Sequence, residues 1–481
     1  MAPVRTGARL ARKPPRLAAV VMAAGKGKRL KSRTPKVLHP VAGRPILWHV
    51  LQAVRGVRPV PVVVVIGHGG EEVRRAVGSW DLGIPLRFVD QGEPLGTGHA
   101  VLVAEEAVGR AEEVLVVSGD EPLLTGAQLR DLLRLHRRRG GAAAVQTTVP
   151  RDPSGFGRVV REGPEFVRIA EESDATVGER AISEVITGTY VFRREDLFGA
   201  LPLVTRENRQ REYYLPDVLA ILREKGERVA VEPADNGGSV GANSRAEIAD
   251  AAAVLRGRIA ERLMERGVTV EDPAHTYIDV EVTVGRDTAI LPGTHLRGAT
   301  RIGDGCTIGP DADLADATVG HEAVVERSVV RGARIGPRAV VGPYTHLRPG
   351  TVLAADTKAG SFVEIKNSRI GEGSKVPHLA YVGDATIGRN VNIGAGTITV
   401  NYDGYGKHRT AIGDDARIGS DTMLVAPVRI GKGAVTGAGS VITKDVPAGA
   451  LAVERDEQRV VRGYRERKDR EMRHRAKRGK A

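Results

Sequence analysis

The sequence predicts an α/β domain with an open, mostly parallel sheet, followed by a parallel β-helix built from hexapeptide repeats. Three observations predict this order. Up to about residue 240, aliphatic strand-like segments alternate with amphipathic helical segments. Beyond that point, one aliphatic residue recurs every six positions. Glycine is abundant, with 59 residues in a chain of 481, which suits the repeated tight corners of a solenoid.

The first half of the chain alternates between two kinds of apolar segment. Five segments are typical of buried strands, namely Leu17–Met22, Val60–Ile66, Leu86–Val89, Val114–Val117 and Ala142–Thr148. Three amphipathic segments between them are typical of helices, namely Ile46–Val54, Glu71–Val77 and Gln128–Arg138. A segment rich in Ala, Arg and Glu from Arg245 to Arg266 then predicts one connecting helix, because its apolar residues have helical spacing.

The second half repeats with a period of six residues. The aliphatic positions are Val284, Ile290, Leu296, Ile302, Ile308 and Leu314, then Ile335, Val341, Leu347 and Leu353, then Ile387 and Ile393, and finally Ile412, Ile418, Leu424 and Ile430. No α-helix or ordinary pair of strands has this period. A hexapeptide β-helix has it, because each short strand points one aliphatic side chain inward and small residues turn the corner. The period predicts the coil, but neither its handedness nor an oligomeric state.

These patterns divide the chain into five parts. We expect a basic N-terminal extension at 1–16, an α/β domain at 17–244, a linker helix at 245–267, a β-helix at 268–456 and a basic C-terminal tail at 457–481. The length alone is typical of about three domains.

The formal net charge of +13 is confined to the two ends of the chain. Residues 1–16 carry +5 and residues 459–481 carry +8, so the rest of the chain is formally neutral. This distribution indicates two solvated, disordered tails, with accessory binding to RNA or anionic lipid as the alternative. No aromatic interleaving and no nucleic-acid-binding module accompany the charge, so we expect no specific nucleic-acid partner.

The cysteine content and the apolar segments indicate a cytoplasmic protein. The single cysteine, Cys306, excludes an intramolecular disulfide and fits a reducing compartment, and we expect it to be a packed residue rather than a nucleophile. No apolar stretch reaches 18 residues, so no membrane span is expected. The apolar run 17–24 is short and leads directly into a motif, which indicates a first core strand rather than a signal peptide.

A glycine-rich turn follows the first predicted strand. Met22-Ala-Ala-Gly25 leads into Lys26-Gly-Lys-Arg29, and Lys36 follows a proline. Small residues at a strand end let backbone N–H groups approach a phosphate, and the cations add positive charge. The spacing differs from that of a kinase P-loop, so the turn by itself is equally consistent with a phosphate loop and with a plain turn.

A carboxylate follows another predicted strand. Ser118-Gly-Asp120 ends a run of aliphatic residues, so Asp120 is expected at the carboxyl edge of the sheet, where ligands bind in open α/β folds. A carboxylate near a phosphate loop is a suitable ligand for Mg²⁺. The alternative is that Asp120 is only the N-cap of the following helix.

Residues 17–243 resemble the Rossmann-like nucleotide-diphospho-sugar pyrophosphorylases. They are most similar to the uridylyltransferase half of the family of bifunctional N-acetylglucosamine-1-phosphate uridylyltransferases/glucosamine-1-phosphate acetyltransferases. Six motifs in family order carry the resemblance: Ala23-Ala-Gly-Lys-Gly-Lys-Arg29 with Pro35-Lys36, Gln91 with Leu95-Gly-Thr-Gly-His-Ala100, Gly119-Asp120, Gly155-Phe-Gly157-Arg158, Ala170-Glu171, and Gly241-Ala-Asn243.

The resemblance implies roles for these residues. Met22, Ala23, Ala24, Gly25, Ser118 and Gly119 would cradle UTP, Gln91, Gly96 and Thr97 would read uracil, Arg29 and Lys36 would stabilise the triphosphate, Asp120 and Asn243 would hold Mg²⁺, and Gly157 and Glu171 would contact the sugar. The implied reaction is in-line attack of a sugar-1-phosphate oxygen on the α-phosphate of UTP, with release of pyrophosphate. Alignment and electrostatics suffice for such chemistry, without a protein nucleophile.

Two positions depart from the family pattern. Ile186, in Glu184-Val-Ile-Thr-Gly188, stands where the family usually has Asn, so an amide that could bind sugar or ribose is replaced by an aliphatic side chain. Ser173 stands where relatives often carry Lys. Both changes bear on sugar selectivity and on uridylyl transfer.

In the predicted coil, residues that break the hexapeptide rule carry the chemistry. Arg348, Lys366, His378 and Tyr381 are large polar or aromatic residues among small corners, and the stretch 399–411 skips the period, so it should form a protruding loop. An imidazole is suited to accept a proton from an amine that attacks a thioester. Arg348 and Lys366 could bind a sugar phosphate. The alternative for His378 is that it is only a surface residue, as a lone histidine usually is.

The same segment resembles the acetyltransferase half of that bifunctional family. The resemblance implies a left-handed β-helix, a homotrimer with each site between subunits, and His378 as the general base. Arg348, Lys366, Tyr381 and Asn392 would hold glucosamine-1-phosphate, and Ala395, Asn401, Tyr402, Ser420, Ala438 and Arg455 would contact acetyl-CoA. The implied product is UDP-N-acetylglucosamine, a precursor of peptidoglycan and of lipopolysaccharide.

Three other functions remain open from the sequence. The protein could be a nucleotidyltransferase whose β-helix is only a scaffold, but a scaffold needs neither His378 nor its cations. It could be an acetyltransferase with altered or lost uridylyl transfer, for which Ile186 is the only support. A non-enzymatic interaction protein would not carry two sets of chemical residues. Sugar phosphates, UTP and acetyl-CoA are therefore the expected small-molecule partners.

Overall fold

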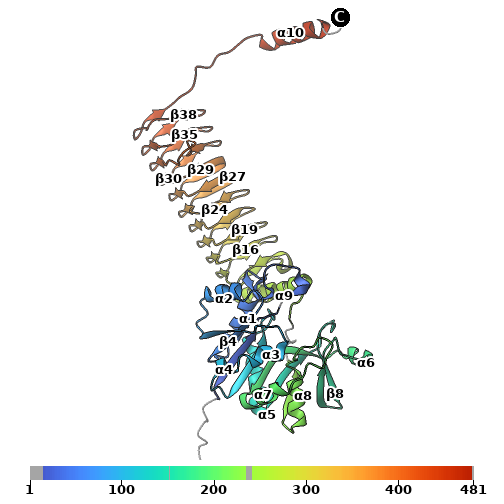
Figure 1. The fold of residues 1–481 in the computed structure, drawn as a ribbon. Helices are drawn as coiled ribbons and strands as arrows, with labels where there is room; N and C mark the ends of the chain where they lie inside the picture. The colour runs from blue at the N-terminus through green and yellow to red at the C-terminus, as the bar shows by residue number, and fades with distance from the viewer. Residues whose placement is uncertain (1–14, 26, 151, 235–240, 479–481) are drawn as a thin grey trace, which may run out of the picture. The chain divides into compact units, whose positions relative to one another are not determined.

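The computed structural model describes residues 15–25, 27–150, 152–234 and 241–478 of the chain. Lys26 and most of the predicted N-terminal extension therefore lie outside the described residues. The chain divides into two compact units, Met1–Glu261 and Arg262–Ala481, which are treated separately below (Figure 1).

The N-terminal unit is built on an open sheet in which six of the seven main strands run in the same direction. Its seven main strands are β1 (Leu17–Met22), β4 (Val62–Ile66), β5 (Leu86–Asp90), β6 (Glu113–Ser118), β7 (Ala143–Thr148), β10 (Val185–Arg193) and β11 (Val229–Pro233). Their order is β11-β7-β10-β6-β1-β4-β5, and β10 is antiparallel to both of its neighbours. The hairpin β8 (Arg158–Glu162) and β9 (Glu165–Ala170) is attached to β10, and β2 (Pro40–Val41) pairs with β3 (Arg44–Pro45).

Helices cover both faces of this sheet, because alternate side chains of a strand point to opposite faces. Ala19 and Val21 of β1 pack with α1 (Ile46–Arg55), α2 (Gly70–Gly78) and α5 (Gly126–Arg139). Ala18 and Val20 pack on the other face with α3 (Thr97–Leu102), α4 (Glu105–Val108), α7 (Arg194–Ala200) and α8 (Asp217–Glu224). The short elements are η1 (Lys28–Leu30), η2 (Lys36–Leu38), α6 (Val177–Arg180) and η3 (Leu201–Leu203). The five predicted strands and three predicted helices are confirmed, with small differences at their ends.

The expected connecting helix is α9 (Arg245–Met264). It begins with a capping arrangement, in which the Ser244 hydroxyl accepts a bond from the Glu247 backbone N–H at 3.2 Å and donates to the Glu247 carboxylate at 2.8 Å. The division between the two compact units falls inside α9, after Glu261.

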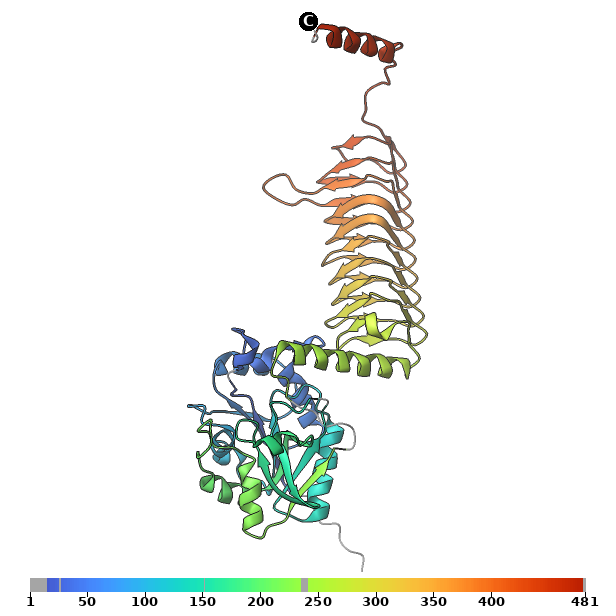
Figure 2. The same cartoon turned by 90° about the vertical axis from the view of Figure 1, so that its right-hand side faces the viewer.

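The second unit is a left-handed parallel β-helix with very short strands (Figure 2). Its 19-stranded sheet contains β12 (Thr269–Val270), β13 (Tyr277–Ile278), β15 (Ala289–Ile290), β16 (His295–Arg297), β18 (Thr307–Ile308), β19 (Asp313–Ala315), β21 (Val324–Val325), β22 (Val329–Arg331), β24 (Val340–Val341), β25 (His346–Leu347), β27 (Lys358–Lys366), β29 (Lys375–Gly383), β31 (Asn392–Ile393), β32 (Ile398–Val400), β34 (Arg417–Ile418), β35 (Met423–Val425), β37 (Val435–Thr436), β38 (Val441–Ile442) and β39 (Leu451–Ala452). Its nine-stranded sheet contains β14 (Thr283–Val284), β17 (Arg301–Ile302), β20 (Thr318–Val319), β23 (Arg334–Ile335), β26 (Val352–Leu353), β28 (Arg369–Ile370), β30 (Ala385–Ile387), β33 (Thr410–Ile412) and β36 (Val428–Ile430). The short helix η4 (Pro273–His275) lies near the start.

The hexapeptide positions form the core of the coil. Ile290, Leu296, Ile308 and Leu314 are fully buried, and Ile290 pairs with Ile308 on the next coil. Cys306 is buried as well, and its thiol donates to the Gly320 carbonyl oxygen at 3.0 Å, which confirms the expectation of a packed residue. The predicted protruding loop is also present between β32 and β33, where it projects from the coil in Figure 2.

The expectation of a disordered C-terminal tail was wrong. Residues Tyr464–Arg478 form the helix α10. Two pairs of opposite charge at helical spacing, Arg465 with Asp469 and Lys468 with Glu471, link successive turns of this exposed helix. The helix was not predicted because the net charge of the segment does not show how its opposite charges are spaced. Among the described residues, no helix has the length and apolarity needed to cross a membrane.

Two adjacent residues of β24 test the role of the inward positions. Val341 is fully buried, whereas Val340 is 38% exposed. Val341→Ala should lower the free energy of unfolding by about 2 kcal/mol, because it removes buried methyl groups and leaves a cavity. Val340→Ala should change it by less than about 0.5 kcal/mol. Urea denaturation followed by far-UV circular dichroism measures both, and equal effects would contradict the inward assignment of position 341.

Candidate functional site

A pocket of about 650 Å³ lies at the carboxyl edge of the sheet in the N-terminal unit. Of the residues predicted to bind UTP or metal, it is lined by Met22, Ala24, Gly25, Arg29, Lys36, Gln91, Gly96, Thr97, Ser118, Asp120 and Asn243. The parallel register explains this convergence, because Met22 at the end of β1 is opposite Ser118 at the end of β6. The glycine-rich turn therefore borders a pocket and is more than a connection between elements.

Three of these side chains meet around one positive charge. The Lys36 ammonium donates to the carboxylate of Asp120 and, at 2.6 Å, to the amide oxygen of Asn243. Lys36 is buried, although it is a lysine, because these two oxygens compensate the loss of water. The Ala242 N–H donates to the Asp120 carbonyl oxygen at 3.0 Å, which fixes the segment that carries Asn243. Two oxygens from distant parts of the chain thus converge on a cation.

The pKa values of two neighbouring acidic residues, Asp120 and Glu121, are shifted in opposite directions. Burial raises the pKa of Asp120, but the Lys36 ammonium and the Ser118 hydroxyl outweigh it and hold the pKa below its ordinary value. The Ser118 hydroxyl donates to Asp120 at 2.6 Å. Complete burial, followed by the charge of Asp120, raises the pKa of Glu121 well above its ordinary value. Of the two carboxyl groups, Asp120 is therefore the one whose negative charge is favoured.

Gly96 is required by a close approach between two segments. Its φ of 113° lies in a region that favours glycine, and a Cβ atom there would lie 2.5 Å from the Tyr213 carbonyl oxygen. The Gln91 amide donates to the Gly96 carbonyl oxygen at 2.9 Å, and the Thr97 hydroxyl accepts from the Leu215 N–H at 3.0 Å. These bonds hold the three residues predicted to read the base in one rigid segment.

Two of the predicted nucleotide residues support the pocket without lining it. Ala23 is buried in the core, and its N–H donates to the Val65 carbonyl oxygen at 2.8 Å. The Gly119 N–H donates to the Met22 carbonyl oxygen at 2.9 Å, and a Cβ at Gly119 would lie 2.7 Å from that oxygen. Gly119 therefore permits the two strand ends to lie close together.

The two residues predicted to contact the sugar lie close to each other, and neither is among the residues that line the pocket. A Cβ atom at Gly157 would lie 3.3 Å from both the Glu171 carboxylate and the Ile186 side chain. The Ile186 N–H donates to the Gly157 carbonyl oxygen at 3.0 Å, and its side chain is buried in the core. Burial, then the nearby charges of Asp217, Asp174 and Glu212, raise the pKa of Glu171 to about 7.

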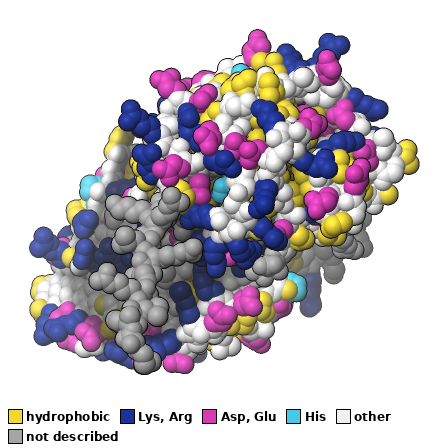
Figure 3. Space-filling view, turned by 90° about the horizontal axis from the view of Figure 1, so that it is seen from below, with side chains coloured by type: hydrophobic (Ala, Val, Ile, Leu, Met, Phe, Trp, Pro, Cys, Tyr) yellow, Lys and Arg dark blue, Asp and Glu magenta, His cyan; other side chains and the backbone are white. Residues whose placement is uncertain are grey.

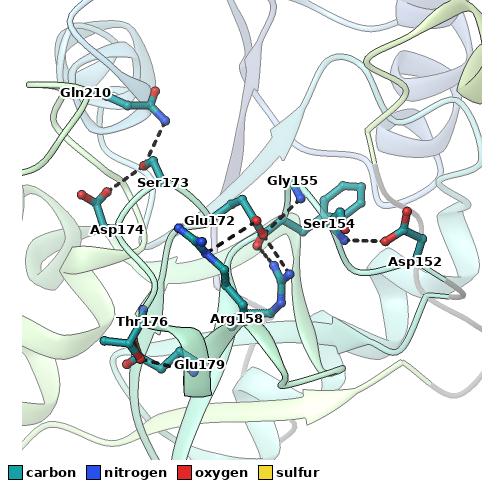
Figure 4. A network of polar contacts seen from close by, with 12 residues as sticks. Asp152, Ser154, Gly155, Arg158, Glu172, Ser173, Asp174, Thr176, Glu179 and Gln210 are labelled. Atoms are coloured by element: carbon teal, nitrogen blue, oxygen red, sulfur yellow. Dashed lines mark hydrogen bonds and ion pairs between the residues drawn. The ribbon is translucent and has the colours of Figure 1, made fainter.

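A buried ion pair anchors the loop that carries Gly157, as Figure 4 shows. The Arg158 guanidinium is almost completely buried and lies 2.8 Å from the Glu172 carboxylate, which also accepts from the Gly155 N–H at 3.2 Å. Ser173 faces the other way: its hydroxyl donates to Asp174 at 2.8 Å and accepts from the Gln210 amide at 3.3 Å. Ser173 thus joins a polar network with Asp174 and Gln210.

Several lining residues were missed from the sequence, namely Gly27, Val37, Pro94, Ala100, Gln210 and Glu212. Gln210 and Glu212 come from the loop that precedes Tyr213. The only signal in the sequence was the pair of glycines Gly96 and Gly98, which indicates a close backbone approach without saying which segment approaches.

In the β-helix, the parallel register brings three of the four predicted sugar-phosphate residues together. Leu347 pairs with Ile365, so Arg348 and Lys366 follow each other on adjacent coils, and Glu364 pairs with Tyr381. The Arg348 guanidinium lies 2.7 Å from the Glu364 carboxylate. Arg348, Lys366 and Tyr381 therefore form one outward-facing group, and Asn392 lies on the next coil in register with Lys375.

The protruding loop adds a cation that was missed from the sequence. Hydrogen bonding with Lys366, followed by its charge, lowers the pKa of Lys407, so the two ammonium groups are neighbours. Asn401 is buried at the start of the loop, and its amide donates to the Asp384 carboxylate at 2.5 Å. Asp403 orders the loop tip by accepting from the backbone N–H groups of Tyr405 and Gly406. Because the loop breaks the period, its approach to Lys366 could not be read from spacing.

Four of the six predicted acetyl-CoA residues form a column on successive coils. The Asp421 N–H donates to the Ala395 carbonyl oxygen, the Gly439 N–H donates to that of Ser420, and the Arg455 guanidinium donates at 3.0 Å to that of Ala438. His378 lies in the same column, on the coil before Ala395. The Gly396 N–H, next to Ala395, donates at 2.8 Å to the carbonyl oxygen of Leu379, which is next to His378.

The exposed imidazole of His378 lies on the outer corner of the coil, in register with Ser361. Tyr402 is exposed at the base of the loop, and its hydroxyl donates to the Gly404 carbonyl oxygen at 2.7 Å. A basic residue at one end of a column of small residues is an arrangement in which an extended ligand could lie along the coils.

Comparison with known proteins gives the same division of the chain. Residues 19–237 match the MobA-like NTP transferase domain family, and residues 409–444 match the bacterial transferase hexapeptide family. The bifunctional protein GlmU of Heliobacterium modesticaldum is 51% identical over 453 residues, which cover 94% of this chain and 98% of that protein. The proteins of the same name from Streptomyces avermitilis and Mycobacterium tuberculosis are 48% and 49% identical, and each match covers 94% of this chain and 94% or 92% of the relative.

The partly buried carboxyl group of Glu171 predicts a pH-dependent stability. Its pKa is raised from 4.5 to about 7, so the folded state binds this proton more tightly than the unfolded state does. The contribution of Glu171 to the free energy of unfolding should therefore fall as the pH rises from about 4.5 to about 7, and stay constant above that range. Glu171→Gln should remove this part of the pH dependence.

Fluorescence in urea measures this effect, because both tryptophans, Trp48 and Trp80, lie in the N-terminal unit. The difference in unfolding free energy between Glu171→Gln and the unaltered protein should shift in favour of the variant between pH 5 and pH 8. Asp217→Asn should move the midpoint to lower pH, because Asp217 is the largest charged contributor to the shift. A difference that does not change with pH would show that Glu171 is ionised throughout.

Proposed function

The chain belongs to the family of bifunctional GlmU proteins, and on this premise we propose how its two candidate sites share the synthesis of UDP-N-acetylglucosamine. It is an enzyme with uridylyltransferase and acetyltransferase activities. In the proposal, the β-helix first transfers the acetyl group of acetyl-CoA to glucosamine-1-phosphate. The N-terminal unit then joins N-acetylglucosamine-1-phosphate to UTP. The observation that carries this division is the separate convergence of the two predicted residue sets, one around Lys36 and one around His378.

Uridylyl transfer is assigned to the pocket in the N-terminal unit. A phosphate oxygen of the sugar substrate attacks the α-phosphorus of UTP in line, the bond to the β-phosphate oxygen breaks, and pyrophosphate leaves. The backbone of residues 22–25 holds the nucleotide, and Gln91 with the segment at Gly96 selects the base. Arg29 and Lys36 compensate the negative charge that develops on the phosphate oxygens. The division of labour is between alignment and charge, with no covalent intermediate.

Asp120 and Asn243 are the residues that would hold Mg²⁺. Their oxygens already converge on the ammonium of Lys36, so this position accepts positive charge. One carboxylate and one amide oxygen fit Mg²⁺, which takes few protein ligands and completes its shell with phosphates and water. Among the described residues, no cluster of three His, Cys, Asp or Glu side chains offers a fuller metal cage. When bound, the metal would neutralise the triphosphate and polarise the α-phosphate.

The sugar is assigned to the group formed by Gly157, Glu171 and Ile186. Gly157 allows its segment to pack closely on Ile169, where a Cβ would lie 2.7 Å from that side chain, and it brings the Glu171 carboxyl group into place to hydrogen-bond to the sugar hydroxyls. Ile186 supplies an apolar wall at the position of the family's Asn. This wall suits the methyl group of an acetamide, so N-acetylglucosamine-1-phosphate remains the preferred substrate in the proposal.

Acetyl transfer is assigned to the outward-facing residues of the β-helix. Arg348, Lys366 and Tyr381 hold glucosamine-1-phosphate, with Asn392 on the following coil. His378 accepts a proton from the sugar amine, whose nitrogen attacks the thioester carbonyl, and the carbon–sulfur bond breaks to release coenzyme A. The acetyl-CoA lies along the column of Ala395, Ser420 and Ala438, with Asn401, Tyr402 and Arg455 beside it.

A homotrimer is part of the proposal, because a large apolar stripe adjoins the acetyltransferase residues. Tyr344, Phe362 and Leu379 are all more than half exposed, and the rings of Tyr344 and Phe362 stack at 5.3 Å between centroids. Leu379 is the neighbour of His378. An exposed stripe of this kind needs a covering partner, and a second copy of the chain would cover it and complete the site. We place the enzyme in the cytoplasm, where UTP and acetyl-CoA are made and where the single thiol of Cys306 stays reduced.

Reciprocal variants test the division of labour. His378→Ala should lower acetyl transfer by about 10²-fold to 10⁴-fold, because the amine loses its proton acceptor, while uridylyl transfer stays intact. Asp120→Ala should remove Mg²⁺-dependent pyrophosphate release while acetyl transfer stays intact. Coenzyme A release from glucosamine-1-phosphate measures the first activity, and pyrophosphate release with a panel of sugar-1-phosphates measures the second.

Each variant is the control for the other, since both activities are measured on the same preparation. Loss of both activities in a folded His378→Ala protein would contradict two independent sites. Unchanged pyrophosphate release in Asp120→Ala would mean that the metal ligands are assigned wrongly. A preference for a sugar without an acetamide group would contradict the role given to Ile186.

The apolar stripe makes a separate prediction about assembly. Phe362→Asp places a charge at the centre of the stripe, so it should dissociate the trimer and lower acetyl transfer without affecting uridylyl transfer. Val441→Asp is the control, because Val441 is also an exposed apolar residue of the β-helix but lies outside the stripe. Light scattering measures the mass of each variant. A Phe362→Asp protein that keeps the mass and activity of the control would show that the stripe is not the subunit contact.

A further inference from the structure

The N-terminal unit contains a second pocket that the proposed reactions do not use. It has a volume of about 700 Å³, comparable with the pocket assigned to UTP. The two lie at opposite ends of the same strand, because Leu17 at the start of β1 lines the second pocket and Met22 at its end lines the first. A ligand in the second pocket would therefore not compete directly with UTP.

The floor of the second pocket is apolar. Leu17 and Leu133 are buried beneath it, and Val57 is half-buried at its side. Val60 lines the pocket and is nevertheless 65% exposed. A large aliphatic side chain left open at the edge of an apolar floor is a surface that favours the flat, apolar part of a ligand.

The rim of the same pocket is formed by arginines. Arg130, Arg134 and Arg137 lie on one face of α5 at helical spacing, and Arg16 and Arg58 approach from the other side. No acidic residue is among the described residues that line the pocket. Figure 3 shows the molecule from below, the end at which α5 is drawn in Figure 1, with dark-blue Lys and Arg side chains gathered on parts of this face.

Two of these arginines have no carboxylate partner among the residues that the structure describes. The other three arginines have carboxylate partners that lie outside the lining. These pairs are Arg16 with Glu112, Arg134 with Asp131 and Arg137 with Glu113. Within the described part of the chain, Arg58 makes no ion pair, and Arg130 makes only a long bond of 3.4 Å to the Gly56 carbonyl oxygen. Two uncompensated guanidinium groups over an apolar floor match a ligand that has both negative charge and a ring.

We propose that this pocket binds a nucleoside phosphate, with the ring on the floor of Leu17, Val57 and Leu133 and the phosphates between Arg58 and Arg130. Guanidinium groups bind phosphate oxygens in a bidentate manner and stack on flat rings, so arginine suits both parts of such a ligand. The residues before Pro15 lie outside the described part of the chain and are not part of the proposed site.

The test is the binding of ATP to the full-length protein, measured by isothermal titration calorimetry at low ionic strength. Arg130→Glu should weaken ATP binding at one site by about ten-fold or more, because a charge-assisted bond to phosphate is replaced by repulsion. Arg138→Glu is the matched control: it makes the same charge change on the same helix, and Arg138 does not line the pocket. It should change the affinity by less than about two-fold. Any binding of ATP to the other two sites is the same in both proteins.

A second variant covers the case in which Arg130→Glu fails to fold. Arg58→Asn removes the other uncompensated charge, and Asn tolerates the positive φ of 52° at this position, so it should weaken ATP binding in the same direction. Equal ATP affinity in the pocket variants and in Arg138→Glu would overturn the proposal. Inorganic tripolyphosphate and adenosine separate the two parts of the ligand. If tripolyphosphate binds as tightly as ATP and depends equally on Arg130, the site recognises only an anion and the nucleoside part is wrong.

Discussion

Parallel strand pairing is the constraint on which both units depend. In a parallel pair, the carboxyl ends of both strands lie at the same edge of the sheet. Residues that are far apart in the sequence therefore become neighbours in space. In the N-terminal unit, this pairing brings the ends of β1 and β6 together and creates the pocket around Lys36. In the β-helix, the same pairing stacks Arg348 beside Lys366 and Glu364 beside Tyr381. The chemistry differs, but one geometric rule positions it.

The candidate site residues of the two units differ in how deeply they are buried. The sheet of the N-terminal unit is covered on both faces, so its functional side chains gather at one edge, where Lys36 can be buried between Asp120 and Asn243. The interior of the β-helix is filled by aliphatic and small side chains, so its candidate site residues lie on the outside, apart from Asn401, which is buried at the start of the loop. An outward site on a single coil has no second wall of its own. This difference explains why one site is a pocket and the other is a surface with an apolar stripe beside it.

Most of the fold could be predicted, because its signals are periodic and local. The aliphatic period of six predicted the coil, and the strand predicted at Leu17–Met22 has the same limits as β1. The residues around Lys36 were predicted by motifs at strand ends. What the sequence could not reveal depends on approach between distant loops: Gln210 and Glu212 enter the first pocket, and Lys407 reaches Lys366. The helix α10 was missed because net charge hides the pairing of individual charges. The second pocket was missed because its arginines come from segments with no shared motif.

The loop between β32 and β33 shows how the coil tolerates insertion. Thr410 pairs with Ala385, 25 residues earlier, whereas Val428 pairs with Thr410, 18 residues earlier, so the extra residues leave the coil and the register resumes unchanged. The inward positions before and after the loop keep their partners. In a repeat scaffold of this kind, the residues that form the core are separate from the residues of the corner loops. A corner of such a coil can therefore be lengthened or shortened without changing the six-residue pattern that forms the core.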